Sequence, residues 1–207
     1  MNPRLRGRTH LIAAPVSLIA GSVLIYLSED FVTKLGVSIF VLSAVNLFGI
    51  SALYHVGNWN PTTKQWLRRL DHSNIYVLIA GTYTPVALLL LSGSKQQILL
   101  LLIWGAALLG VLLSTLWITA PRVLSVAVYL AMGWASLAYL VDIYNAGGAA
   151  VLTLIALGGL SYSVGAVVYA RKSPNLSTVW FGFHELFHAF TILGFLFHFS
   201  AITLFAL

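Results

Sequence analysis

The stretch from Gln97 to Trp117 carries no charged side chain and is dominated by leucine, isoleucine, alanine and glycine. A run of about 20 mostly apolar residues is long enough to cross the hydrocarbon core of a bilayer as a helix. Inside lipid the backbone polar groups must be satisfied within the protein, so only helices and closed barrels cross membranes. Barrel strands alternate polar and apolar residues over short segments, and this run does not. The sequence therefore predicts a helical membrane protein.

Composition supports this prediction, because 59% of the 207 residues are hydrophobic and 8% are charged, whereas soluble domains carry about 25% charged residues. We expect an all-α fold, a single integral membrane domain over residues 1–207 that forms a seven-transmembrane-helix bundle. Turn residues and charges separate the predicted spans. Their approximate bounds are 10–28, 34–56, 72–92, 96–118, 121–143, 148–170 and 182–206.

Lysine and arginine predict the orientation, because cytoplasmic loops of membrane proteins are enriched in these residues. With seven spans, Lys34 and Lys95 fall on one side, and the other nine basic residues fall on the side of the N-terminus. We therefore expect a multi-pass protein of the cell membrane with its N-terminus in the cytoplasm and its C-terminus outside. The net charge of +6 does not indicate a nucleic-acid partner, because topology explains these short basic loops. The nine residues are Arg4, Arg6, Arg8, Lys64, Arg68, Arg69, Arg122, Arg171 and Lys172.

Ionisable side chains within membrane spans are costly and usually functional. Ser51 and His55 close the second predicted span, Asp71 lies at the start of the third, and His184 and His188 lie at the start of the seventh. A spacing of four places each pair on one face of its helix. With the predicted orientation, all five residues lie near the cytoplasmic end of the bundle.

Three protein ligands with a fourth position open to water are the arrangement of catalytic zinc sites. His55, His184 and His188 fit it, and Asp71 is positioned to hold the bound water or to orient a ligand. Ser51 is a weaker candidate for the same supporting role. Zinc lowers the pKa of its bound water to about 7, which yields a nucleophile at neutral pH. The structural alternative is that histidines near a membrane interface only snorkel or form hydrogen bonds.

Three further histidines are not assigned to the metal. His72 points about 100° away from its neighbour Asp71 around the helix and is expected to be a packing residue. His10, at the start of the first span, could line the same cavity. His198 lies about 15 Å along the helix from His188, so we expect it to form a hydrogen bond within the bundle.

Residues 184–188 also read H-E-x-x-H, the pattern of zinc metalloprotease helices, in which Glu185 would be the general base. Such a protease usually has a later acidic third ligand. No acid follows Glu185 in this chain, so the protease hypothesis is disfavoured.

Three groups of residues together resemble the hemolysin III family, the bacterial branch of the progestin and adipoQ receptor (PAQR) superfamily. The resemblance implies a seven-helix fold with zinc near the cytosolic face. It implies His55, His184 and His188 as the ligands and Asp71 as the residue that contacts the zinc-bound water. The groups are Ser-Ala-Leu-Tyr-His at 51–55, Leu-Asp-His-Ser-Asn-Ile-Tyr at 70–76 with Ala-Gly-Thr-Tyr-Thr-Pro at 80–85, and His184-x-x-x-His188 with Gly194 and His198-Phe199.

The chain departs from the superfamily at its first motif, E-x-x-N-x-x-x-H. His10 can be the histidine of that motif, but Pro3 and Arg6 stand where glutamate and asparagine would be. The function of that motif in receptors therefore does not transfer to this chain.

The resemblance extends to alkaline ceramidases, which cleave lipid amides with a similar zinc site. Our leading hypothesis is a zinc-dependent hydrolase of a membrane lipid amide or ester. A receptor or regulator with structural zinc, which binds lipid as a ligand, is the first alternative. The family name implies a pore-forming or lytic protein, although the chain has no secreted amphipathic segment. A channel or transporter ranks lower, because the polar residues crowd one third of the bilayer depth.

Overall fold

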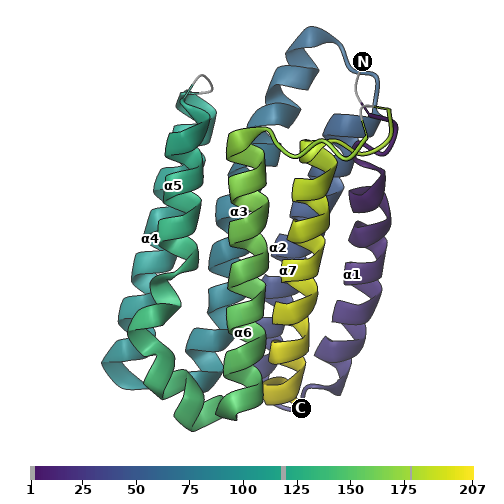
Figure 1. The fold of residues 1–207 in the computed structure, drawn as a ribbon. Coiled ribbons are helices and arrows are strands. Elements are labelled where there is room, and N and C mark those ends of the chain that lie inside the picture. Colours follow the sequence, from purple (N-terminus) through teal and green to yellow (C-terminus); the bar gives the residue numbers. More distant parts are fainter. Residues whose placement is uncertain (1–2, 118–119, 178) are drawn as a thin grey trace.

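The computed structural model describes residues 3–117, 120–177 and 179–207, and within them the fold is all-α, as predicted (Figure 1). The N-terminus and the C-terminus lie at opposite ends of the bundle, called here the upper and lower ends as drawn in Figure 1. The helices are α1 (Arg8–Leu27), α2 (Phe31–Val56), α3 (Pro61–Leu90), α4 (Gly93–Leu116), α5 (Arg122–Gly133), a 3₁₀ helix η1 (Ala135–Tyr139), α6 (Leu140–Arg171) and α7 (Phe183–Ala206).

Helix α3 begins earlier than the predicted span, which starts at residue 72. Asn60 caps it by accepting a hydrogen bond from the Thr63 amide at 2.8 Å, and Pro61 occupies its first turn. Both residues favour a helix start, and no proline or glycine follows until Gly81. Helix α3 therefore runs without a break from Pro61 into the predicted span.

The fifth predicted span, 121–143, is interrupted in the structure. Helix α5 ends at Gly133, where the Tyr83 hydroxyl donates to the Gly133 carbonyl at 2.6 Å and accepts from the Ser136 amide at 2.9 Å. Broken helices persist within a bilayer only where protein groups satisfy the freed backbone. Tyr83 provides both partners at this break, which the sequence did not indicate.

Six helical stretches among the described residues are long and apolar enough to cross a membrane. One of them, Arg122–Arg171, has 50 residues and would extend about 75 Å as a straight helix, far beyond a hydrocarbon core of about 30 Å. Gly148 has non-helical angles within it (φ 77°, ψ 180°), and the chain reverses direction at the lower end (Figure 1). The count of seven crossings and their orientation stay predictions.

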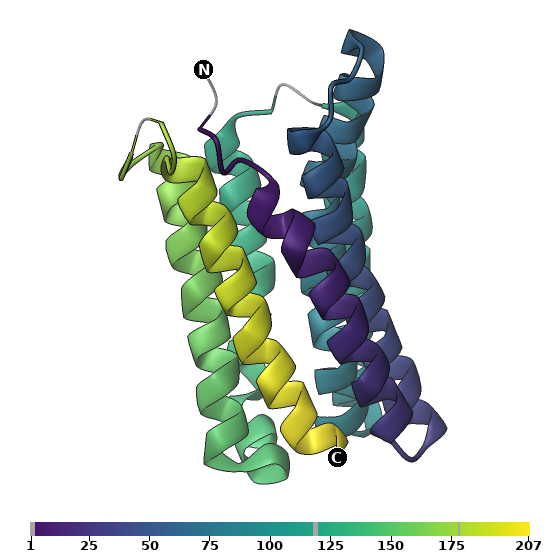
Figure 2. The same ribbon diagram turned by 90° about the vertical axis from the view of Figure 1, so that its right-hand side faces the viewer.

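Aromatic rings hold α2 against α7 below the upper end of the bundle. The Phe195 ring stacks on Phe40 with centroids 5.3 Å apart and meets Phe48 edge-on at 5.4 Å. All three rings are buried. Figure 2 shows α1 and α2 on one side of the bundle and α6 beside α7 on the other. These rings therefore join the two sides close to the predicted site.

Small residues allow α6 to approach α7 closely. A Cβ atom at Gly158 would lie 2.2 Å from the His198 ring, and one at Gly165 would lie 2.9 Å from the Phe190 Cβ. His198 donates from Nδ1 to the Gly194 carbonyl at 2.8 Å, which confirms the hydrogen bond expected within the bundle. Glycine at these positions thus fixes how α7, and the histidines on it, sit against α6.

Gly158→Ala should destabilise the protein, because the new methyl group would overlap the buried His198 ring. Overpacking of this kind costs about 1–3 kcal/mol. The matched control is the adjacent Gly159→Ala, whose Cβ would meet nothing closer than Trp134 at 3.9 Å. Thermal unfolding in detergent measures both variants. Equal midpoints for the two would show that α6 and α7 do not pack as described.

Candidate metal centre

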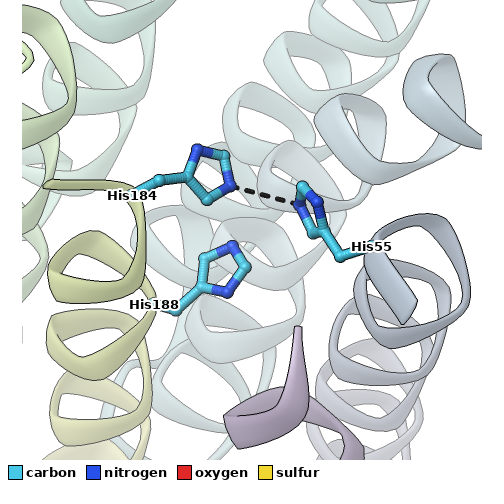
Figure 3. A group of neighbouring side chains, drawn as sticks. All are labelled: His55, His184 and His188. Atoms are coloured by element: carbon cyan, nitrogen blue, oxygen red, sulfur yellow. Dashed lines mark hydrogen bonds between the residues drawn. The ribbon is translucent and has the colours of Figure 1, made fainter. Parts of the chain in front are cut away.

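Three histidines from two helices converge at the upper end of the bundle (Figure 3). His55 lies in the last turn of α2, and His184 and His188 lie in the first two turns of α7. Their candidate ligand nitrogens all lie within 4.8 Å of one another. The Nε2 atoms of His184 and His55 are 3.1 Å apart. The structure therefore brings the three predicted ligands together.

The spacing of these nitrogens suits a shared metal ion. Two nitrogens that each lie about 2.0–2.1 Å from one tetrahedral zinc are roughly 3.3 Å apart, close to the 3.1 Å between His55 and His184. His188 is 2% exposed, and its Nδ1 atom has no hydrogen-bond partner among the described residues. A buried polar atom without a partner is costly. The three-histidine set therefore fits a metal ion.

Asp71 lies beside the histidines but forms no direct hydrogen bond to His55 or His72. Its Oδ2 atom is 3.9 Å from His55 Nε2 and 3.8 Å from His72 Nδ1, too far for direct hydrogen bonds and suited to contact through one water. Ser51 is buried one turn before His55 and lines the same cavity as Asp71. Both candidate catalytic residues thus border the histidine cluster.

A cavity of about 360 Å³ opens against the cluster and is lined by Ser51, Asp71, His184 and His188. A second cavity, also of about 360 Å³, adjoins it between α3, α5, α6 and α7. Phe187 lines both cavities. Most residues around the second cavity are apolar, for example Leu78, Val86, Leu130 and Ile155. A cavity that contains the polar side chains of the cluster therefore adjoins a more apolar cavity within the bundle.

His10 is a neighbour of the cluster that the sequence left unassigned. Its ring stacks on His188 with centroids 3.9 Å apart and an interplanar angle of 12°, and it touches Phe48 at 5.0 Å. It is 2% exposed and lines the upper cavity. Its position at the start of the first predicted span suggested that it could line the cavity, but nothing in the sequence indicated that its ring stacks on His188.

Glu185 is fully engaged in holding the start of α7. Its Oε1 accepts from Arg6 Nε at 2.6 Å, and its Oε2 accepts from the Gly182 amide at 2.8 Å. The side chain is 0% exposed. Because both carboxylate oxygens are occupied, the geometry favours a structural role over that of a protease general base. Arg6 occupies the position at which the E-x-x-N-x-x-x-H motif of the PAQR superfamily has asparagine. The ion pair with Glu185 is therefore possible because this chain departs from that motif.

Residues 3–7, called here the N-terminal strap, lie across the upper end of the bundle. The Arg4 amide donates to the Val179 carbonyl at 2.9 Å, and the Arg4 guanidinium lies 4.8 Å from the centre of the Trp180 ring. Gly7 has a φ of 75°, and a Cβ there would lie 2.5 Å from the Cβ of His55. The N-terminal strap therefore needs glycine at position 7, where it passes close to His55 of the histidine cluster.

The two other histidines lie outside the three-residue group. His72 donates from Nδ1 to the Arg68 carbonyl at 2.8 Å, and its Nε2 lies 3.4 Å from the Tyr169 hydroxyl. It therefore packs in the wall of the upper cavity, as expected for a packing residue. His198 lines the second, more apolar cavity and lies outside the histidine cluster.

Comparison with known proteins identifies the family. The model of the family described as "Haemolysin-III related" matches residues 1–199. The chain is 38% identical to the hemolysin-3 homolog of Bacillus subtilis (strain 168) over 147 residues, which cover 70% of this chain and 68% of the relative. It is 32% identical to hemolysin-3 of Bacillus cereus over 176 residues, covering 83% and 80%.

A more distant relative is the monocyte to macrophage differentiation factor of Homo sapiens, 26% identical over 198 residues that cover 94% of this chain and 80% of the relative. The family match over residues 1–199 includes the parts of the helices that carry the histidine cluster. Together with the long apolar helices, these matches show that the chain is a multi-pass membrane protein of the haemolysin-III related family.

Proposed function

We propose that this protein is a zinc-dependent hydrolase that cleaves an amide or ester bond of a membrane lipid. The observation that carries the proposal is the group of three histidine ligands within 4.8 Å of one another. This group borders a cavity that adjoins an apolar chamber inside the bundle. A metal site beside a cavity that can hold an acyl chain is an arrangement suited to lipid hydrolysis.

The donor set supports zinc as the metal. Three neutral imidazole nitrogens with no fourth protein ligand leave one coordination position for water or substrate, as in catalytic zinc sites. His55, His184 and His188 would hold the ion. When bound, zinc acts as a Lewis acid toward a carbonyl oxygen and lowers the pKa of a water molecule.

The carboxylate of Asp71 is the proposed proton acceptor. Its Oδ2 atom lies 3.9 Å from His55 Nε2, beside the three proposed ligands, and it would take the proton that a water at the open coordination position loses on attack. Ser51, which lines the same cavity, would orient this carboxylate through its hydroxyl. The leaving group of the lipid would receive the same proton from Asp71.

The apolar chamber is the proposed site for an acyl chain. Most side chains around it are apolar, so an acyl chain that moves there from the bilayer exchanges one apolar environment for another and pays no desolvation cost. A lipid with its chain in this chamber would present its carbonyl group to the upper cavity. Membrane lipid is therefore the proposed substrate class.

The orientation that we propose has seven crossings, with the N-terminus in the cytoplasm and the metal cluster near the cytosolic face. Gly148, whose φ is 77°, would divide the 50-residue stretch into two crossings. The nine basic residues then lie on the cytoplasmic side, as topology favours.

A second candidate function is a lipid-responsive regulator in which zinc is structural. The observation that favours it is that the ligands come from α2 and α7, so a bound ion would cross-link these two helices. In that case zinc would stabilise the fold, and the protein would turn over no lipid.

Alanine substitution of any one ligand should remove most of the bound zinc, because two remaining histidines hold it poorly. His55→Ala, His184→Ala and His188→Ala should therefore behave alike, while His198→Ala should keep its zinc. Metal analysis after one common purification gives the stoichiometry of each variant. Full retention of zinc by His55→Ala, or its complete loss from His198→Ala, would refute the three-histidine site.

Asp71→Ala should separate zinc binding from turnover. Zinc affinity should fall by roughly 10–100-fold, as for other residues that support metal ligands, whereas lipid hydrolysis by the zinc-saturated variant should disappear. The assay is release of fatty acid from amide and ester lipids, with and without a chelator. If the zinc-loaded wild-type protein releases no fatty acid from either class, the regulator hypothesis replaces the hydrolase.

Single-cysteine labelling should establish the orientation, because the chain has no cysteine of its own. Leu176→Cys and Ser94→Cys place one exposed thiol at each end of the bundle. A membrane-impermeant thiol reagent should label Ser94→Cys on intact cells and Leu176→Cys only after permeabilisation. Labelling of both on intact cells would be inconsistent with the proposed topology.

A further inference from the structure

Three cationic side chains line the same upper cavity as the histidine cluster. Arg68 comes from α3, Arg122 from the first turn of α5, and Lys172 directly follows the end of α6. Among the described residues that line this cavity, Asp71 is the only acid. The cavity therefore carries a surplus of positive charge next to the metal cluster.

Arg122 is the most deeply placed of the three. Its guanidinium carbon lies 4.6 Å from the centre of the Tyr169 ring. Its Nη1 atom is buried and has no hydrogen-bond partner in the described part of the chain. An unsatisfied buried donor is costly, more so when it is charged. A guanidinium turned to a cavity in this way is suited to an anionic oxygen.

The position of Arg122 relative to the metal cluster is set by one aromatic ring. Tyr169 contacts Arg122 on its face, and its ring centroid lies 5.8 Å from that of His184. A ligand in the cavity can therefore reach the histidines with one group and Arg122 with another. In a glycerophospholipid the acyl ester and the phosphate occupy neighbouring glycerol carbons, so a single molecule carries both groups at short range.

Topology alone does not explain this placement. Other basic residues at the upper end of the bundle turn away from the cavity: the Arg69 guanidinium lies 4.7 Å from the centre of the exposed Trp66 ring, and Arg171 is exposed. Arg69 also has a buried nitrogen, Nε, without a hydrogen-bond partner among the described residues, but it does not line the upper cavity. Arg122 differs from Arg69 and Arg171 because it both lines the cavity and has an unpartnered nitrogen, as a ligand-binding residue should.

We propose that the upper cavity binds a lipid with an anionic phosphate headgroup. Arg122 contacts the phosphate, with Arg68 and Lys172 adding charge at the mouth of the cavity, and the acyl chains enter the apolar chamber. The choice of a phospholipid as substrate rests on the proposed hydrolase function, whereas the binding of the lipid does not. Arginine forms two parallel hydrogen bonds to a phosphate, which gives the site its selectivity.

The test compares two lipids with identical acyl chains, phosphatidic acid and diacylglycerol, bound to the purified full-length protein loaded with zinc. Phosphatidic acid should bind at least about tenfold more tightly, the effect of one hydrogen bond to a charged group. Arg122→Gln should remove most of this preference and leave diacylglycerol binding unchanged. Arg122→Lys should keep part of it, because it retains the charge but not the paired donors.

Arg171→Gln is the matched control, since it removes a positive charge from the same end of the bundle without changing the cavity. It should leave the preference for phosphatidic acid intact. Zinc content and thermal unfolding of each variant verify the fold, and Arg122→Lys carries the test if Arg122→Gln does not fold. An equal loss in Arg171→Gln would assign the preference to general surface charge and overturn the proposal.

Two further ligands distinguish the source of the anion. A free fatty acid that binds as tightly as phosphatidic acid, with the same dependence on Arg122, would assign the site to a carboxylate and overturn the headgroup proposal. Inorganic phosphate that displaces phosphatidic acid at equal concentration would assign it to a free anion. Because binding is measured without turnover, absence of hydrolysis with a retained preference would refute the hydrolase and leave this inference standing. Hydrolysis of neutral lipids, combined with equal binding of phosphatidic acid and diacylglycerol, would refute this inference and leave the hydrolase proposal standing.

Discussion

A hydrocarbon bilayer offers no hydrogen-bond partners, and this constraint determines both the fold and the place where polar chemistry can occur. It explains why the regular elements among the described residues are all helices and why Tyr83 binds both backbone groups at the break after Gly133. It also makes the histidine cluster conspicuous, because buried imidazole nitrogens with few partners destabilise a membrane protein. A metal ion of the kind proposed for this cluster would satisfy all three imidazoles together, and in that case the cluster and the fold would depend on each other.

The cluster requires that α2 and α7 meet at a fixed depth and rotation. The ring contacts of Phe195 with Phe40 and Phe48 set the distance between these helices, and Gly158 sets the approach of α6 to α7. Above the cluster, the pairing of Arg6 with Glu185 fixes the first turn of α7. The ligands are thus held from below by apolar packing and from above by an ion pair. Such two-sided support is what keeps a metal site within the narrow geometry that it needs.

Sequence reasoning succeeded where depth in the membrane decides the answer. Runs of apolar residues marked the helices, and the shared depth of His55, His184 and His188 predicted that they would meet. Sequence reasoning failed where a contact depends on the rotation of a helix about its axis or on a partner that is distant in the chain. The stacking of His10 on His188 depends on how α1 is turned, and the ion pair of Arg6 joins residues 179 positions apart. The early start of α3 was missed because span predictions follow hydrophobicity, whereas the cap at Asn60 is a polar signal.

The distance along the chain between the two halves of the cluster has a consequence for how the protein is made. His55 and His184 are separated by 129 positions, so the ribosome delivers one ligand long before the other two. While the intermediate helices are being inserted, His55 and the strap above it have no partner on α7. The metal ion proposed for this cluster could bind only after α7 has joined α2 in the membrane. Metal loading would therefore mark a chain synthesised through α7, and a product truncated before α7 would keep most of its candidate membrane spans yet bind no metal at this cluster.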